Sequence, residues 1–320
     1  MIEPQTRCEP EWPEDEVLRD ALFRGDRMLE SAGSILAHLL SARDHSLFSD
    51  EILARIRGMV NHIASQILRI QAEATGHRAR EHFAAEHCLS LSERLLGNRP
   101  LVSHCHALAL EWQVSTRLEA QLSLDPVLSP MMQRLVGHED PMIASAAMAA
   151  LAAQARFART QRRMELPLGE LPGDRFHDAL LEWRSFNGEE RSDALVRAET
   201  KLRDQYDEAG GRLSLIARVV SSLGSEAQSL LAIESAGASL FLTALAARSG
   251  QPRELAAFST HEQQMARLAL GLRAAGLKPE EIETQVLRIH PDVFPPREIE
   301  QIGTREAARM LEASALDCRD

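Results

Sequence analysis

Aromatic residues are scarce in this chain, since Phe, Trp and Tyr make up only 4% of its 320 residues. The core must therefore be built from aliphatic side chains, and the abundant Ala and Leu favour helices over strands. Strand patterns are missing too, because apolar and polar residues do not alternate with a period of two and β-branched residues never cluster for long. These absences predict an all-α fold, with room for one large domain or two ordinary ones.

Long apolar segments are also absent. The longest nearly uncharged stretch runs from Ser235 to Ala247, which is too short to span a bilayer and predicts a buried core helix. The acidic start MIEPQTRCEPEWPEDE lacks the apolar segment of a secretory signal. The few cysteines show no spacing typical of a disulfide or zinc framework: Cys8, Cys88, Cys105 and Cys318. We therefore expect a cytoplasmic protein with reduced thiols and no membrane association.

Two further absences concern charge and catalysis. The formal net charge of −11 argues against a general nucleic-acid binder, because phosphate contacts require a basic surface. The motifs G-x-S-x-G and G-x-x-x-x-G-K-[ST] do not occur, and the run that begins at His261 has Met265 where a zinc-protease motif needs His. The sequence therefore predicts no catalytic residue and no cofactor.

Helical periodicity, in contrast, runs through most of the chain. Between residues 51 and 74 the apolar positions share one face at a spacing of 3.6 residues, and Ser49 and Asp50 can cap this helix. Three further starts combine a capping residue with a proline in the first turn: Asn98 with Pro100, Ser129 with Pro130, and Asp140 with Pro141. Other helices are expected near residues 15–43, 78–96, 175–186, 190–208, 212–223, 226–248, 253–258, 261–274, 279–289, 296–302 and 305–315. Glycines stand where C-terminal caps are expected, at Gly224, Gly250, Gly276 and Gly303.

The helical pattern is interrupted at two places that predict domain boundaries. Asp125-Pro126 breaks it, and the helices beyond are shorter. This break favours an N-terminal helical bundle over residues 1–124 and a stacked helical array over residues 125–320. The loop of residues 165–174, rich in Pro and Gly, is the alternative boundary.

The alanine-rich segment from Gly137 to Phe157 raises the question of why so many small residues stand together. It follows a short helix that begins near Pro130, and the two helices are joined by a tight turn. Small side chains allow neighbouring helix axes to approach closely, near the lower end of the usual range of roughly 8–10 Å. We expect an inner helix that is packed on both sides.

This helix pair resembles a HEAT-type repeat, and the chain also resembles uncharacterised bacterial all-helical proteins with degenerate HEAT-like units. The resemblance lies in Asp140 and Pro141 at the turn, in Ile143 at a Val/Ile position, and in Ala147 and Leu151 at the following inner positions. One departure is Ala144, where the repeat usually has Arg. The resemblance implies a HEAT-like stacked array with an extended surface. The alternative is an ordinary α-helical domain with one alanine-rich helix.

A patch rich in His and Cys is the candidate metal site. His82 and Glu86 are four residues apart on one expected helix, and His104 on the next helix could complete a set of ligands for zinc or iron. The run from His82 to His87 is one residue too long for the inverted zinc motif, and its two histidines diverge around the helix. The patch also includes His106 in the run SHCH, and the competing interpretation places Cys88 in the core and the histidines on helix flanks.

Four arginines follow the alanine-rich run, at Arg156, Arg159, Arg162 and Arg163. Three of them, at positions 156, 159 and 163, fall on one helical face. Guanidinium groups suit carboxylates and phosphates, so this face could bind an acidic or phosphorylated protein. A solvated last helical turn is the alternative interpretation, because cations favour the C-terminus of a helix.

The features together predict a non-enzymatic cytoplasmic adaptor or regulator that binds another protein through a helical-repeat surface. A metal- or small-ligand-binding helical sensor that uses the His/Cys patch is the first alternative. An enzyme of unrecognised type is the second. The sequence leaves the oligomeric state open.

Overall fold

The computed structural model of the chain describes residues 14–41, 50–188 and 192–317, and only the backbone of residues 14, 15, 32–41 and 315–317. Every regular element in these ranges is a helix, which confirms the predicted all-α fold. The elements of the first half are α1 (Glu14–Ser41), α2 (Asp50–Ala74), α3 (Arg80–Gly97), α4 (Arg99–Leu122), α5 (Pro130–Val136), α6 (Pro141–Gln161) and η1 (Leu168–Glu170). The elements of the second half are α7 (Gly173–Phe186), α8 (Asp193–Asp204), α9 (Arg212–Ser222), η2 (Gly224–Leu231), α10 (Ile233–Ser249), α11 (Arg253–Phe258), η3 (Glu262–Gln264), α12 (Met265–Ala274), α13 (Pro279–Ile289), η4 (Arg297–Glu300) and α14 (Thr304–Asp317).

Local capping chemistry determines where the helices begin, as the sequence predicts. The side chains of Asn98, Ser129 and Asp140 accept hydrogen bonds from backbone N–H groups of the first turns of α4, α5 and α6. Each bond satisfies a donor that has no partner within the helix. The expected end of the first helix at Arg43, the capping residue Ser49 and the expected start at residue 190 lie outside the described residues.

Glycines end several helices, also as predicted. Gly224, Gly250 and Gly276 adopt left-handed backbone conformations with φ of 51°, 73° and 102°. A residue without a Cβ adopts this conformation at little cost. Gly303 does not have a positive φ.

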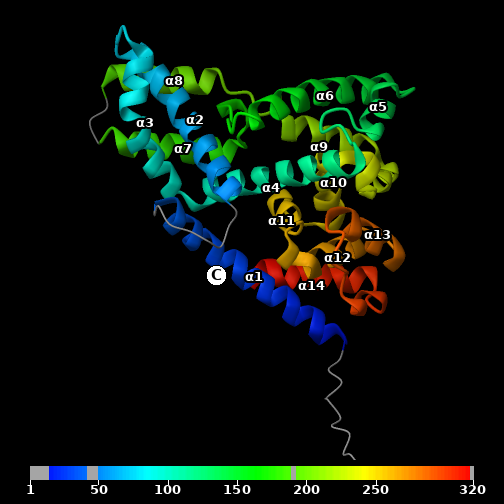
Figure 1. Cartoon of the computed structure of the whole chain (residues 1–320). Coiled ribbons are helices and arrows are strands. Elements are labelled where there is room, and N and C mark those ends of the chain that lie inside the picture. The colour runs from blue at the N-terminus through cyan, green and yellow to red at the C-terminus, as the bar shows by residue number, and fades with distance from the viewer. Residues whose placement is uncertain (1–13, 42–49, 189–191, 318–320) are drawn as a thin grey trace, which may run out of the picture.

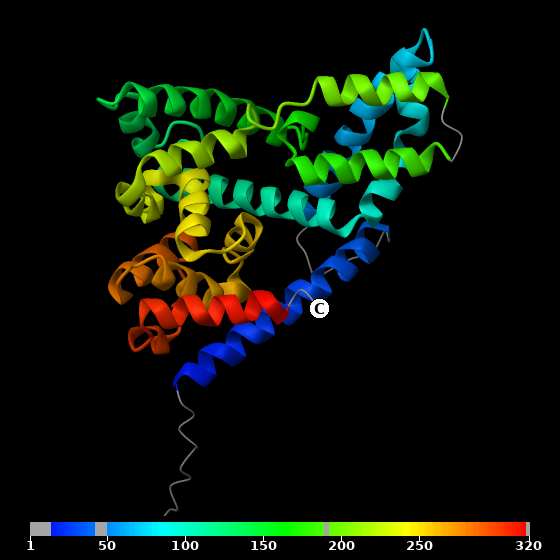
Figure 2. The same cartoon turned by 180° about the vertical axis from the view of Figure 1, so that it is seen from behind.

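α4 lies in the middle of the molecule (Figure 1). It packs against α2, α3 and α7 and also against α10, α11 and α13. α7 and α8, which follow the expected boundary near Leu124, pack against α3 and α2, which precede it. α1 packs against α12 and α14, so the first and last described helices are in contact (Figure 2).

The apolar segment Ser235–Ala247 lies within α10 and is largely buried, which confirms its prediction as a core helix. The expected helix over residues 226–248 is divided, however, into η2 and α10. α10 is also kinked at Gly237, whose φ is 74°. A Cβ at Gly237 would lie 3.3 Å from the Cβ of Ser129, so the kink is also a point of close approach to the start of α5.

The alanine-rich helix α6 lies at an edge of the molecule, which corrects the expectation of an inner helix packed on both sides (Figure 1). Its buried side faces α5 and α9 through Ala147, Ala150 and Ala153, among others. Its opposite side is exposed, and Ala149 and Ala152 lie there. The alanines therefore serve both a packed and an open face.

Across the described residues, none of the helices combines the length and apolar character that a bilayer crossing requires.

Candidate functional site

The exposed face of α6 is the candidate protein-binding surface. Apart from one serine, its first four turns carry only apolar side chains, among them Met142 and Met148, which are 78% and 53% exposed. The exposed positions of this face are Pro141, Met142, Ser145, Met148, Ala149, Ala152, Ala155, Arg156, Arg159 and Arg163. No charged residue occurs in α6 before Arg156. A contiguous apolar strip on an exposed helix is unusual for a surface that contacts only water.

The four predicted arginines, Arg156, Arg159, Arg162 and Arg163, are all exposed. Three of them lie on or beside the apolar strip, because residues three, four and seven apart share a helix face. Arg162 is the C-cap residue of α6, so the four arginines lie in the last turns of the helix and directly after it. The structure therefore joins the predicted arginine face to an apolar strip that the sequence analysis did not connect with it.

The arginine-bearing end of α6 is fixed against α2. Arg55 on α2 donates a hydrogen bond from Nη1 to the backbone oxygen of Gln161, with an N···O distance of 2.8 Å. Beside it, a Cβ added at Gly58 would lie 2.6 Å from the backbone oxygen of Met164. Only a glycine allows this close approach of α2 to the turn after α6. The position of the arginines is therefore set by two contacts to a second helix.

The structure does not bring the candidate metal ligands together. His82 and Glu86 are exposed on α3, whereas His104 is buried in α4 and pairs through Nδ1 with Glu254 at 3.1 Å. In the described part of the chain, no group of three or more His, Cys, Asp or Glu side chains could hold a metal ion.

The expectation that the histidines of this patch lie on helix flanks is wrong for His104 and His106, which are both buried. The reason is that α4 is enclosed by other helices over most of its length, so two residues on different sides of it are both covered. Cys105 is buried and Cys88 is half-buried, and both are free thiols. Burial raises the pKa of the Cys105 thiol to about 12, so this sulfur is held in its unreactive protonated form.

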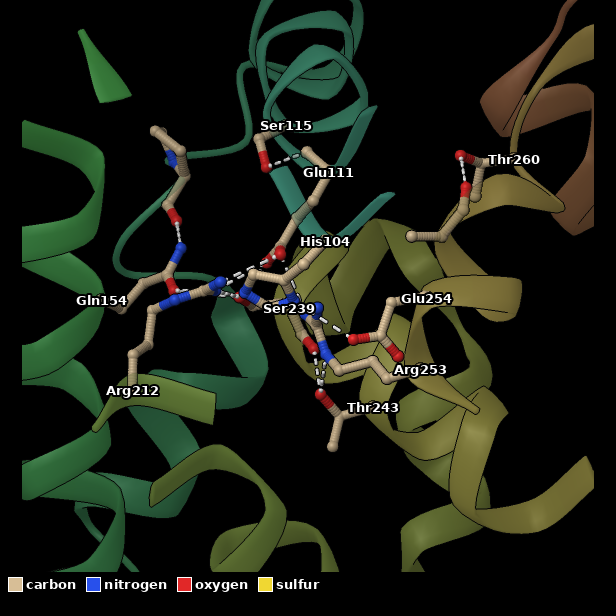
Figure 3. A network of polar contacts seen from close by, with 12 residues as sticks. His104, Glu111, Ser115, Gln154, Arg212, Ser239, Thr243, Arg253, Glu254 and Thr260 are labelled. Carbon is tan, nitrogen blue, oxygen red and sulfur yellow. Dashed lines mark hydrogen bonds and ion pairs between the residues drawn. The ribbon is translucent and has the colours of Figure 1, made fainter. Parts of the chain in front are cut away.

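A buried polar centre, which the sequence analysis missed, lies where α4, α9 and α10 meet (Figure 3). Glu111 on α4 is 0% exposed and Arg212 at the start of α9 is 1% exposed. The guanidinium of Arg212 donates to both carboxylate oxygens of Glu111, with N···O distances of 2.7 and 3.0 Å. Ser239 on α10 donates to the same carboxylate. The centre therefore ties three helices together through charge-assisted hydrogen bonds.

Further groups complete the shell around this centre. Gln154 on α6 accepts from Arg212, lies with its Oε1 2.9 Å from the hydroxyl oxygen of Ser239, and donates to the backbone oxygen of Pro126. The guanidinium carbon of Arg212 lies 3.5 Å from the centroid of the Phe157 ring. α6 is therefore held to the centre by a polar contact and an aromatic contact with Arg212.

Burial of Glu111 opposes its ionisation, but the charges of Arg212 and Arg253 and the hydrogen bonds from Arg212 and Ser239 outweigh this effect. The pKa of Glu111 is consequently lowered well below its usual range. The centre holds one carboxylate and two guanidinium groups, because Arg253 also forms an ion pair with Glu111 at 3.0 Å. Such a group of buried charges contributes to a unique arrangement of helices only while every member keeps its partner.

Arg253 connects the polar centre to the surface. Its side chain is 16% exposed, and its Nε donates to Thr243 at 3.0 Å. It forms part of the lining of a pocket of about 380 Å³, together with Thr243, Glu254 and carboxylates from other elements, Glu170 and Glu208. The remaining wall is mostly apolar, with Leu171, Pro172, Leu213, Ala217, Ala246 and Ala247. This pocket could hold a small molecule that combines an apolar body with charged groups.

A second buried ion pair holds the two ends of the described chain together. Arg267 on α12 pairs with Asp26 on α1, and Ser314 on α14 contacts both of them. Gln251 accepts a further hydrogen bond from Arg267 at 2.8 Å. This cluster is the polar core of the contact among α1, α12 and α14.

Sequence signals for these centres exist, but they are weak. Glu111 is the one charged residue in the run from Leu101 to Val114, and a lone charge in an apolar helical run predicts a buried partner. Nothing in the sequence identifies Arg212 or Arg253 as that partner, because many arginines are available. The pairing becomes visible only in three dimensions.

Comparison with known proteins finds no matching family model, no matching curated protein and no matching solved structure. The likeness of the α5–α6 pair to a HEAT-type repeat therefore stays a prediction that rests on the residues alone.

Proposed function

We propose that this protein is a non-enzymatic adaptor or regulator that binds another protein through the exposed face of α6. One observation carries the proposal: α6 exposes a strip without charge from Pro141 to Ala155 and continues it directly into four exposed arginines. The cytoplasm is the expected location, and a HEAT-like stack is the architecture that this use of the surface suggests.

The composition of the face supports a protein partner. Met and Arg are enriched in protein interfaces, and flexible Met side chains such as Met142 and Met148 adapt to different shapes. Arginines at the end of the strip favour an acidic or phosphorylated partner, because a guanidinium group binds carboxylate or phosphate with two parallel hydrogen bonds. No ion pair of these four arginines is present among the described residues, so their charge is available to a partner.

Affinity capture with full-length protein as bait tests this proposal. A variant with Arg156, Arg159, Arg162 and Arg163 all replaced by Glu should lose a partner that the wild type retains. The matched control is a second fourfold Arg→Glu variant on other helices, at exposed positions: Arg218, Arg288, Arg297 and Arg305. The proposal fails if the wild type captures no protein at all. A partner lost from both variants would show a general charge effect and would remove the α6 surface from the proposal.

A small-ligand sensor is a second candidate, favoured by the pocket beside Arg253. His104, a member of the predicted His/Cys patch, reaches this pocket through its contact with Glu254. Amino acids, polyamines and carboxylic acids can be screened for a rise in the melting temperature of the wild type. An Ala217→Trp variant fills the pocket while leaving Arg253 in place, and a bound compound should no longer stabilise it. Absence of any stabilising compound counts against this candidate.

A further inference from the structure

We infer that the protein partner of the α6 face is a second copy of this chain, paired antiparallel about a two-fold axis. The inference rests on the proposed function, because it names the partner of the same surface. Its basis is that the two ends of α6 carry complementary charges, while the strip between them is apolar and uncharged.

The shape of the strip suits another helix. Ser145, Ala149, Ala152, Arg156 and Arg159 follow one another at spacings of three and four residues, so they form one nearly straight row along α6. The middle of the row holds only alanine side chains. Around Ala149 and Ala152 two such rows can approach toward the short end of the interhelical range, about 8 Å, because alanine side chains do not hold the backbones apart.

Charge decides the orientation of the pair. The turn before α6 carries Glu139 and Asp140, both exposed, and the last turn carries Arg159, Arg162 and Arg163. At 1.5 Å per residue, Asp140 and Arg163 are about 34 Å apart along the helix, so they cannot neutralise each other within one copy. An antiparallel partner places its acidic end against the arginines and its arginines against the acidic end. A parallel partner would place arginines against arginines.

The same arrangement also fits the side-chain sizes. A two-fold axis between Leu151 and Ala152 brings Asp140 level with Arg163 of the second copy and Met148 level with Ala155. A large side chain then faces a small one on both sides of the axis, which is the complementarity that packed helices require. α6 itself carries both the acidic and the basic end, and both the large and the small side chains. A second copy of α6 is therefore complementary to the first, and no other protein is needed.

The first test is the oligomeric state of the full chain. Sedimentation equilibrium or light scattering over about 1 to 200 µM should show a reversible dimer of the wild type. Ala152→Glu places two carboxylates beside the axis and should weaken the dimer at least about tenfold. Ala85→Glu, at an exposed alanine of α3, is the matched control and should dimerise like the wild type.

The second test determines the orientation by cysteine cross-linking. Ala152→Cys should form a disulfide with itself under mild oxidation, above the background of the wild type. Met142→Cys should not, because an antiparallel pair separates the two copies of this position by about 28 Å. A mixture of Met142→Cys and Arg159→Cys should form a cross-linked heterodimer. Self-linking at position 142 would indicate a parallel pair and would overturn the inference.

Charge exchange gives a third test, which does not depend on cross-linking. One variant carries Arg159→Glu, Arg162→Glu and Arg163→Glu, and the other carries Glu139→Arg. Each variant alone sets like charges against one another and should dimerise more weakly than the wild type, whereas their mixture should form a heterodimer. If the mixture dimerises no more strongly than either variant alone, the antiparallel arrangement is contradicted.

These outcomes separate the inference from the proposed function. A wild type that remains a monomer up to about 200 µM, or a dimer insensitive to Ala152→Glu, overturns self-pairing and leaves the adaptor proposal to affinity capture. A dimer disrupted by Ala152→Glu, in a protein that captures nothing else, supports self-pairing and limits the proposed protein binding by α6 to a second copy of this chain.

Discussion

Glu111 and Arg212 form a bidentate ion pair in the interior although 101 positions separate them in the chain. Neither side chain reaches solvent to any useful extent, so the pair depends on its own hydrogen bonds and on Ser239 and Gln154. If one member of the pair is removed, the other remains as a buried charge that has neither its counter-ion nor hydration. The polar centre is therefore where single substitutions should have their largest effect on stability.

Replacing Glu111 by Gln keeps the shape of the side chain and removes its charge. Arg212 and Arg253 are then buried together without a counter-ion, and we expect the free energy of unfolding to fall by about 3–5 kcal/mol. Urea unfolding followed by circular dichroism measures this change. Glu119→Gln, at an exposed position of the same helix, is the control and should stay within about 0.5 kcal/mol of the wild type. If Glu111→Gln has an effect as small as that of Glu119→Gln, the polar centre contributes little to the free energy of unfolding.

Acid should destabilise the protein through its paired carboxylates. Hydrogen bonds from Arg184 lower the pKa of Glu199 to about 2, although burial acts in the opposite direction, and the pKa of Glu111 is lowered as well. Unfolded Glu takes up a proton near pH 4.3, so protonation favours the unfolded chain below that value. The contribution of each carboxylate is present above about pH 5 and is lost as the pH falls toward the pKa of the folded state.

Denaturant unfolding at several pH values between 7 and 3 checks this prediction. The free energy of unfolding of the wild type should decline as the pH falls, and Glu199→Gln and Glu111→Gln should each show a shallower decline. An unchanged slope in either variant would mean that this carboxylate is not ionised through its ion pair in the folded protein.

His106 should resist protonation. Burial, together with the charge of His261, lowers the pKa of His106 to about 4. The unfolded chain binds a proton at this position near pH 6.5, whereas the folded chain does not, so stability is lost as the pH falls from about 6.5 to about 4. NMR titration of the imidazole resonances measures the midpoint, and a His106→Gln variant assigns the signal. A midpoint near pH 6 would contradict the prediction.

The contact between α2 and the end of α6 can be tested at Gly58. A Cβ there would lie 2.6 Å from the backbone oxygen of Met164, so Gly58→Ala must displace one of the two segments. We expect a loss of about 1–3 kcal/mol of unfolding free energy, as for other overpacked sites. Gly97→Ala is the control, because nothing lies within 4 Å of a Cβ at that position of α3. Equal effects of the two substitutions would contradict the close contact.

The helix boundaries could be predicted because their causes are local. Ser129 and Asp140 accept hydrogen bonds from N–H groups two or three residues later, and Gly250 ends α10 by its own backbone conformation. None of these features needs information from distant parts of the chain. For this reason the expected starts of α4, α5 and α6 and the expected end of α10 agree closely with the observed ones, whereas the helix expected over residues 226–248 is divided into η2 and α10.

The burial of particular residues could not be predicted in the same way. Alanine is compatible with a packed face and with an open one, so the alanine run did not show that α6 lies at an edge. His104 and His106 are two residues apart on α4 and would diverge on a surface helix, yet both are covered because α4 is enclosed. The partners of Glu111 were equally hidden, since they come from α9 and α11.

The central place of α4 has a consequence for the order in which the protein can be built. Translation completes α4 long before α9 and α11, so the carboxylate of Glu111 must stay hydrated until Arg212 and Arg253 have been synthesised. The first helices can surround only part of α4 during this interval. A nascent chain stalled before Arg212 therefore exposes an apolar surface around an unpaired charge, and we expect it to be a substrate for chaperones that the finished protein does not engage.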